Sequence, residues 1–208
     1  MSTMTLPPAA PAFAEFPPIS VQMSPAVRMT QDQFFDFCQQ NPDMRFERTA
    51  DGELIITAPS TGDAGFQDTE VVTQLNIWAK AVGKGKVMGP SGGFILPNGA
   101  NRGPDASWLS PEQMNSLSPE QRKKFLPVCP FFLIEVRSPS DSIPKLQEKM
   151  IEYIANGCQL GWLIDPKTRQ VHVYRPGKTP GVLDNLRSIS GDPELPGFVL
   201  DLILVWEP

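Results

Sequence analysis

The run of residues 131–136 places the strongest constraint on how this chain folds. It reads Phe-Phe-Leu-Ile-Glu-Val, so every side chain in it is apolar apart from one carboxylate. An apolar run of this length is typical of a central strand that is covered on both faces. Burying an unpaired carboxylate is costly, so Glu135 needs a cation or hydrogen-bond donors. The run therefore predicts a buried sheet with helices against it and a polar partner beside Glu135.

Two interpretations of Glu135 follow from its place in this strand. In one, the carboxylate forms a structural ion pair with Arg137 or Lys149. In the other, it belongs to a functional site, because groups with perturbed ionisation gather at such sites. We favour the functional interpretation, since further carboxylates and a lysine are expected near the same strand.

Periodicity along the rest of the chain predicts the elements around this strand. Expected helices are a short one after Thr30, a long one over 63–82, two short ones within 110–127, and one over 143–156. Expected strands cover a hairpin at 46–56, then 86–88 with 93–96, 105–109, 161–165, 170–174 and an edge strand at 198–206. This order predicts an α/β (α+β) fold, with a mixed central sheet flanked by helices and preceded by an N-terminal hairpin.

The N-terminal segment differs from the rest in composition. Its first 27 residues hold six prolines and a single charge, Glu15. Because proline interrupts both helices and strand ladders, we expect residues 1–28 to form a proline-rich, irregular arm and 29–208 to form one domain. Phe13, Phe16 and Ile19 could still dock on the domain or on a second subunit.

Several reaction types are excluded by residues that the chain lacks. His172 is its single histidine, so a site with two histidine ligands cannot form. The sequence has no GxSxG nucleophile elbow, no phosphate-binding P-loop and no GxGxxG dinucleotide motif. Its three cysteines stand far apart, without the paired spacing of a zinc site. The chemistry must therefore rest on carboxylates, lysine and a hard metal ion.

The net charge and the hydropathy of the chain limit which partners are expected. The formal net charge is −5, so non-specific attraction to a phosphate backbone is weak and any nucleic-acid role must rest on a local site. The first 27 residues do not resemble a secretory signal, and no stretch approaches the roughly 20 apolar residues that span a bilayer. Together with the dispersed cysteines, these features predict a cytoplasmic protein with no membrane partner.

Asp105 and Lys149 are the residues expected to join Glu135. Asp105 alone would read as a turn aspartate, but at the start of a neighbouring strand it gives a second carboxylate at one end of the sheet, suited to Mg²⁺. Lys149 lies about a quarter-turn from the centre of the buried face of its helix, so its ammonium can extend toward Glu135. A solvated helix lysine is the alternative.

Taken together, these motifs resemble the Uma-two family. The likeness covers roughly residues 29–206 and includes Phe46-Glu47, Pro104-Asp105, the segment 134–141, Lys149 with Tyr153, Asn156-Gly157, the segment 161–166, and the segment 195–198. The resemblance implies a restriction-endonuclease-like core of the PD-(D/E)XK superfamily. It also implies an endonuclease that uses Mg²⁺ or Mn²⁺ and has DNA as its substrate.

The resemblance also implies roles for individual residues. Asp105, Glu135 and the carbonyl of Val136 would hold the metal. The position two residues after the glutamate, where the superfamily has lysine, holds Arg137, so the resemblance implies that a migrated lysine, Lys149, takes that role. Arg137 would then neutralise developing charge. Glu47 and Asp68 are secondary candidates for the metal site, or else a hairpin charge and a helix-start charge.

Two other functions remain as alternatives. The acidic net charge and the missing lysine after Glu135 favour a catalytically inactive binding or regulatory protein on a nuclease scaffold. A hydrolase of another phosphorylated substrate is the third option. Related nucleases pair two active sites, so the resemblance also implies a homodimer.

Overall fold

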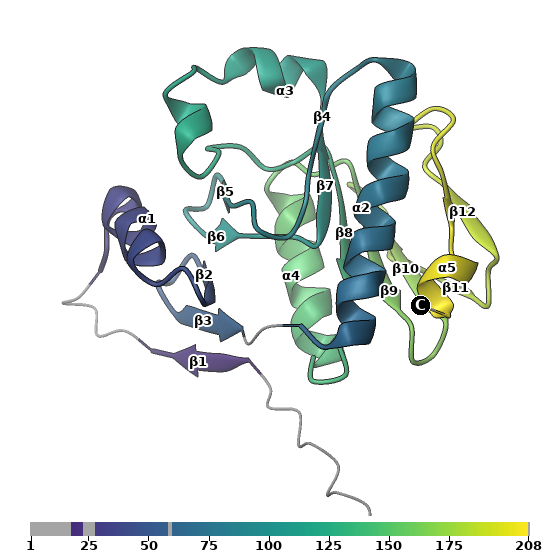
Figure 1. The fold of residues 1–208 in the computed structure, drawn as a ribbon, viewed down its shortest axis with the longest axis horizontal. Helices are drawn as coiled ribbons and strands as arrows, with labels where there is room; N and C mark the ends of the chain where they lie inside the picture. The colour runs from purple at the N-terminus through teal and green to yellow at the C-terminus, as the bar shows by residue number, and fades with distance from the viewer. Residues whose placement is uncertain (1–17, 23–27, 58–59, 208) are drawn as a thin grey trace, which may run out of the picture.

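The computed structural model describes residues 18–22, 28–57 and 60–207 (Figure 1). Within them the larger sheet has six strands in the order β11-β10-β9-β8-β7-β4. Their bounds are Gly181–Asp184, Gln170–Tyr174, Leu160–Asp165, Phe132–Val136, Ala106–Leu109 and Lys86–Met88. β8 and β9 run parallel, and the other neighbours run antiparallel. The sheet is therefore mixed, as predicted.

The strand β8 is covered on both faces, as its apolar run predicts. Phe132 and Ile134 pack into a core with α2 (Gly62–Val82), while Leu133 packs into a second core with α4 (Ile143–Ala155). Figure 1 shows these two helices on either side of the strand. Because side chains alternate along a strand, Glu135 shares the α4 side with Leu133.

A five-stranded sheet lies beside the larger one, in the order β1-β3-β2-β6-β5. Its strands are Ile19–Val21 (β1), Leu54–Thr57 (β3), Arg45–Arg48 (β2), Asn101–Arg102 (β6) and Phe94–Ile95 (β5). The predicted hairpin is β2–β3, whose turn contains Gly52 at φ 93°. Positive φ is available to glycine at little cost.

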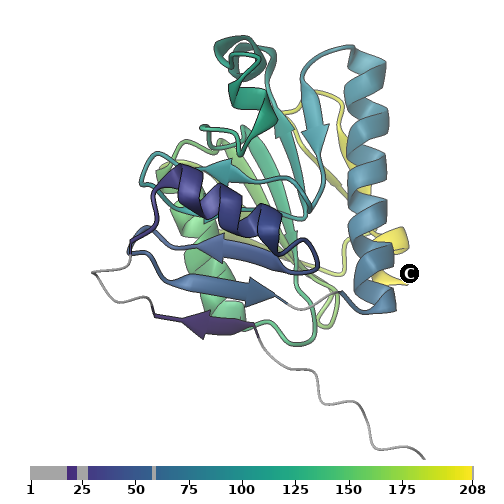
Figure 2. The same ribbon diagram turned by 60° about the vertical axis from the view of Figure 1, so that its left-hand side comes forward.

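The helix α1 (Gln31–Gln40) begins at the predicted cap, where the Thr30 hydroxyl accepts a hydrogen bond from the Gln33 backbone at 3.2 Å. It covers one face of the five-stranded sheet, and α4 lies beyond the other face (Figure 2). Phe46 and Arg48 of β2 contact α1. The alternate residues Arg45 and Glu47 therefore face away from α1.

The structure corrects three local predictions. Residues 86–88 and 93–96 were expected to form one interrupted strand, but β4 and β5 lie in different sheets. Ile19–Val21, in the segment expected to be irregular, pairs with β3; residues 1–17 and 23–27 of that segment lie outside the described residues. The second short helix is a single 3-10 turn at Gln121–Lys123, after α3 at Pro111–Ser116.

The predicted edge strand at 198–206 is also wrong over most of its length. Only Val199–Asp201 (β13) is extended, and it pairs with Ser188–Ser190 (β12) in a separate two-stranded sheet. Ile203–Trp206 forms the short helix α5 instead. Leu202, Val205 and Trp206 are buried at helical spacing, and α5 packs on α2, so tertiary burial decides this segment. Among the described helices, none is long and apolar enough to cross a membrane.

Candidate active site

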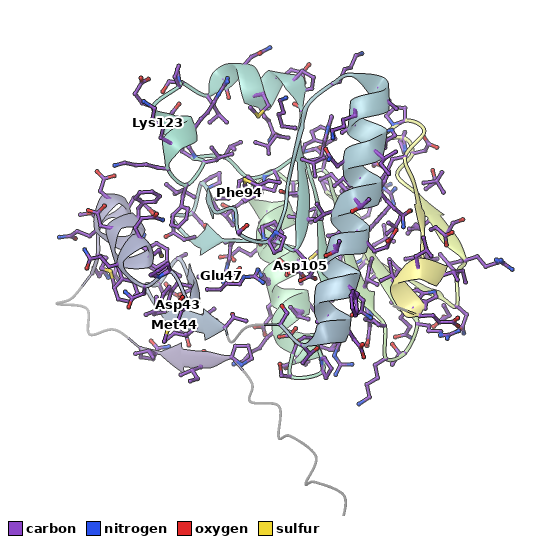
Figure 3. All side chains as sticks on the ribbon, in the orientation of Figure 1. Asp43, Met44, Glu47, Phe94, Asp105 and Lys123 are labelled. Carbon is purple, nitrogen blue, oxygen red and sulfur yellow. The ribbon has the colours of Figure 1, made fainter. Side chains whose placement is uncertain are left out.

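A cleft of about 830 Å³ opens between the five-stranded sheet, α4 and the start of α2. Its walls include every carboxylate named from the sequence, namely Glu47, Asp68, Asp105 and Glu135, together with Lys149. Figure 3 shows Glu47 and Asp105 at the junction of the two sheets. The structure thus brings these five side chains to one place, while Arg137 does not line the cleft.

Strand pairing brings Asp105 close to Glu135. β7 and β8 are antiparallel with Ala106 opposite Ile134, so the start of one strand meets the end of the other. Oδ2 of Asp105 accepts a hydrogen bond from the backbone N–H of Val136 at 2.8 Å. Side-chain exposures are 13% for Asp105 and 5% for Glu135. Two nearly buried carboxylates therefore lie at the same edge of the sheet.

Lys149 reaches Glu135 as the helix geometry predicts. Its Nζ lies 2.8 Å from Oε1 of Glu135 and 2.9 Å from Oε1 of Glu47. Tyr153, one turn later on α4, donates a hydrogen bond to the same Oε1 of Glu135 at 3.0 Å. Among the described residues no donor contacts Oε2 of Glu135, so that oxygen is left for another partner.

Two residues of this ionic network do not follow from the sequence prediction. Arg102 on β6 contacts Glu47 at 3.2 Å and Glu152 of α4 at 2.6 Å. Arg102 is the single charged residue in 87–104, which is a signal that could have identified it. Glu152 follows Lys149 by three residues, a spacing that places both on one side of a helix.

Burial and mutual repulsion raise the pKa values of the two carboxyls at the sheet edge. Burial raises the pKa of Asp105 to about 7, and the charge of Asp68 adds to the rise against the opposing effect of Arg45. Burial likewise raises the pKa of Glu135 to about 7; Lys149 opposes this, while Asp105 and Glu47 add to it. Negative charge is therefore in excess at this edge, despite Lys149.

Glu47 has the opposite shift. Burial raises its pKa, but Lys149 and Arg102 together outweigh that effect and lower the value to about 2. Burial also acts against the charge on Lys149, yet Glu135 and Glu47 hold the pKa of Lys149 above its usual value. At neutral pH, Glu47 is a carboxylate and Lys149 an ammonium.

Asp68 and Arg45 stand at the border of the charged group. Burial raises the pKa of Asp68 to about 6; Arg45 lowers it, and Glu135 adds to the rise. Arg45 is 37% exposed and lies 3.8 Å from Oδ1 of Asp105, too far for a hydrogen bond. Asp68 thus adds negative charge near Asp105 without a close cation of its own among the described contacts.

Arg137 is engaged elsewhere. Its Nη1 lies 3.0 Å from Oδ2 of Asp165, at the end of β9, and its Nε donates to the carbonyl of Asp141 at 3.4 Å. The Asp165 side chain is 3% exposed, so Arg137 neutralises a buried charge there. This placement ties the loop after β8 to β9, and it favours Lys149 over Arg137 as the cation of the carboxylate site.

The carboxylate pair fits a hard divalent cation. Within the described ranges, no group of three or more His, Cys, Asp or Glu side chains forms a metal cage. Magnesium does not require one, because it keeps several waters and takes one or two protein carboxylates. Within the part of the chain that the structure describes, Oε2 of Glu135 has no donor and Oδ1 of Asp105 has only the distant Arg45. The donor atoms and the excess negative charge suit Mg²⁺ or Mn²⁺.

Comparison with known proteins identifies the family. The model of the family described as "Uma2: Putative restriction endonuclease" matches residues 31–202. Comparison with curated proteins gives no match.

Among solved structures, a crystal structure described as a "putative nuclease belonging to DUF820", from Anabaena variabilis ATCC 29413, has a TM-score of 0.70 and 21% identity. The match covers 86% of this chain and 97% of that chain. At this identity the likeness shows a shared fold, and it confirms the predicted restriction-endonuclease-like architecture. The description of this family as restriction endonucleases supports the assignment of the protein as a nuclease. Because the family model spans most of the sequence, the chain belongs to the Uma2 family.

Proposed function

We propose that the protein is a magnesium- or manganese-dependent endonuclease that hydrolyses phosphodiester bonds in DNA. One observation carries the proposal: Asp105 and Glu135 lie together in an open cleft, with the ammonium of Lys149 2.8 Å from Glu135. Family membership supports a nuclease. DNA is the proposed substrate because the family is described as restriction endonucleases, which act on DNA.

Asp105, Glu135 and the carbonyl of Val136 are the proposed metal ligands. The bound ion would supply Lewis acidity, which polarises a phosphate and lowers the pKa of water. Val136 is well placed for this role, because its N–H already donates to Asp105. That hydrogen bond keeps the Asp105 carboxylate at the end of β8, beside Glu135.

Lys149 acts as a hydrogen-bond donor in this proposal and not as a base. Its pKa is raised by Glu135 and Glu47, so it holds its proton at neutral pH. An ammonium fixed between two carboxylates can orient water and stabilise negative charge that develops on a phosphate. Arg137 instead holds the loop after β8 through Asp165.

The cleft itself offers DNA few cations. Its cationic lining residues are Arg45, Lys145, and Arg102 and Lys149, which are already paired with carboxylates. Because carboxylates outnumber cations along the walls, the metal would supply much of the attraction for phosphate. Two such sites in one assembly would allow both strands of a duplex to be cut in a single binding event. We therefore propose that a homodimer, the commonest symmetric assembly, is the active form.

The test is a cleavage assay on duplex DNA, single-stranded DNA, RNA and free nucleotides, with Mg²⁺, Mn²⁺ or EDTA. The wild type should cut DNA only with a divalent metal, and Glu135→Ala should not. Lys149→Met should lower the rate by roughly 10²–10³-fold, the effect of losing one charge-stabilising donor, whereas Arg137→Met should stay close to wild type. Lys123→Met, at an exposed position well away from Glu47 and Asp105 (Figure 3), is the control.

The outcomes separate the alternatives. If Arg137→Met is inactive and Lys149→Met is nearly normal, Arg137 is the catalytic cation. If nucleotides are cut and DNA is not, the protein is a different phosphohydrolase. If the wild type cuts no substrate with any divalent metal, the proposal is wrong and a binding or regulatory role on a nuclease scaffold takes its place.

A further inference from the structure

A single oxygen atom of Glu47 contacts both Lys149 and the backbone of the segment that carries Asp105. Oε1 lies 2.9 Å from Nζ of Lys149. The same atom accepts a hydrogen bond from the backbone N–H of Gly103 at 2.9 Å. Gly103 stands two residues before Asp105, so Glu47 holds the lysine and the segment that carries the aspartate at once.

The other oxygen of Glu47 is also occupied. Oε2 accepts a hydrogen bond from Nη1 of Arg102 at 3.2 Å. Nε of Arg102 donates to Oε2 of Glu152 at 2.6 Å, and Oε1 of Glu152 accepts from Asn98 at 2.9 Å. Arg102 is 8% exposed, so its contacts with Glu47 and Glu152 are largely shielded from solvent, and Glu47 has little freedom to turn.

We propose that Glu47 is a positioning residue: through its Oε1 it fixes Lys149 and the Gly103–Asp105 segment relative to each other, and it is not a metal ligand. This inference rests on the proposed function for the meaning of that arrangement. Displacing Glu47 toward a metal would break its contacts with Lys149, Gly103 and Arg102, so the geometry opposes the ligand role that the sequence leaves open for it.

The five-stranded sheet takes part in this positioning. Glu47 lies on β2 and Arg102 on β6, both in that sheet, whereas Lys149 and Glu152 lie on α4. The alternating chain Glu135, Lys149, Glu47, Arg102, Glu152 therefore joins the small sheet to the helix that carries the catalytic lysine. A shift of the hairpin would move Lys149 as well.

Nuclear magnetic resonance of lysine ammonium groups tests the contact without requiring activity. The wild type should give a Lys149 NH₃⁺ signal that is protected from exchange with water, assigned by its loss in Lys149→Met. Glu47→Gln keeps the size and the acceptor oxygen but removes the charge, and it should lose or strongly shift that signal. Glu194→Gln is the matched control, because Glu194 is 18% exposed and paired with Arg175 outside the cleft.

Kinetics and metal binding test the positioning role. Glu47→Gln should lower kcat by roughly 10²-fold, the size of effect that a small misplacement of a catalytic group produces. The KM for DNA and the dissociation constant for Mn²⁺ should stay at wild-type values, since an amide oxygen can still accept from Gly103. Glu135→Gln should instead abolish Mn²⁺ binding.

Each outcome decides the question. An unchanged Lys149 signal in Glu47→Gln overturns the proposal, and so does a loss of Mn²⁺ affinity as large as that of Glu135→Gln. If Glu47→Gln does not fold, Glu47→Asp replaces it: its charge remains but its carboxylate is one methylene short, so wild-type kcat with a wild-type signal would refute the positioning role. If the wild type cuts nothing, the proposed function fails while the resonance signal still decides whether Glu47 holds Lys149.

Discussion

The charged network of the cleft has two ends, Glu47 with Arg102 and Asp105 with Glu135. Glu47 and Asp105 are buried alike, but their pKa values shift in opposite directions. The side chains of Glu47 and Asp105 are 15% and 13% exposed, yet the pKa of Glu47 falls to about 2 and that of Asp105 rises to about 7. Burial acts in the same direction on both. The difference comes from Lys149 and Arg102, which both approach Glu47 within 3.2 Å.

This comparison separates a balanced end from an end with excess negative charge. In the balanced end, carboxylates and cations alternate, so an added cation would have to displace one already present. At the other end, Asp105 and Glu135 share one lysine while Asp68 adds to the charge. A divalent cation at that end would relieve repulsion, which is why we place the proposed metal there and a positioning role at Glu47.

Removing the cation that both ends share should have the largest effect. Lys149→Met leaves Glu135 and Glu47 without their common partner, and loss of one member of a buried ion pair costs roughly 3–5 kcal/mol. Urea unfolding at pH 8 measures the change against Lys123→Met, an exposed lysine. A change below about 0.5 kcal/mol, typical of surface positions, would show that the two carboxylates do not depend on Lys149.

Added metal should act on one end only. Mg²⁺ or Mn²⁺ at about 100 times its dissociation constant should stabilise the wild type by roughly 2.7 kcal/mol. Glu135→Ala should abolish the gain in melting temperature, and Glu194→Gln should retain it. Equal gains in wild type and Glu135→Ala would place the metal elsewhere.

The pH dependence of stability should have opposite signs at the two ends. The folded state holds the proton of Glu135 up to about pH 7, against an ordinary pKa of 4.5. Its contribution is therefore complete below about pH 4.5 and is lost as pH rises through 7, at up to about 1.4 kcal/mol per pH unit. Glu47 contributes above about pH 4.5 and loses that contribution only as pH falls toward 2.

Comparing metal-free wild type with Glu135→Gln by urea unfolding between pH 5 and 8 isolates the first of these effects. The wild type should lose stability relative to the variant as pH rises, because the glutamine does not titrate. A constant difference across this range would mean that Glu135 is ionised throughout, and that the excess of negative charge is absent.

The smallest effect is expected from the N-terminal arm, which we predict to be dispensable for folding. Deleting residues 1–27 removes β1, whose Ile19 and Val21 are 61% and 38% exposed, so this strand contributes little buried apolar area. We expect the unfolding free energy to fall by less than about 1 kcal/mol. Loss of solubility, or of a dimer seen by light scattering, would instead assign the arm an assembly role.

The sequence predicts the unbalanced end better than the balanced one. The apolar run of β8 and the periodicity of α4 fix on which side Glu135 and Lys149 lie, because both patterns are local. Arg102 belongs to the two-residue strand β6, which pairs with β2 through Arg48 and Asn101. Because this pairing joins residues far apart in the sequence, it leaves no periodic signal. Neither the contact of Arg102 with Glu47 nor its effect on the pKa of Glu47 could therefore be predicted.

Arg137 shows the same limit. It stands two residues after Glu135, and the resemblance implied a role for it in neutralising developing charge. The structure pairs it with Asp165 of β9, a partner that depends on parallel pairing of β8 with β9. The family pattern locates the segment, while tertiary contacts decide which cation faces the carboxylates.

Anomalous scattering from crystals soaked in Mn²⁺ tests the central claim most directly, because it locates the cation itself. The account predicts one strong peak in contact with Asp105, Glu135 and the carbonyl of Val136. It also predicts that the Glu47–Lys149 and Glu47–Arg102 contacts remain in place. A peak coordinated by Glu47 or Glu152 would contradict it. So would the absence of a peak at Asp105 and Glu135 in crystals soaked at a Mn²⁺ concentration above the dissociation constant measured in solution.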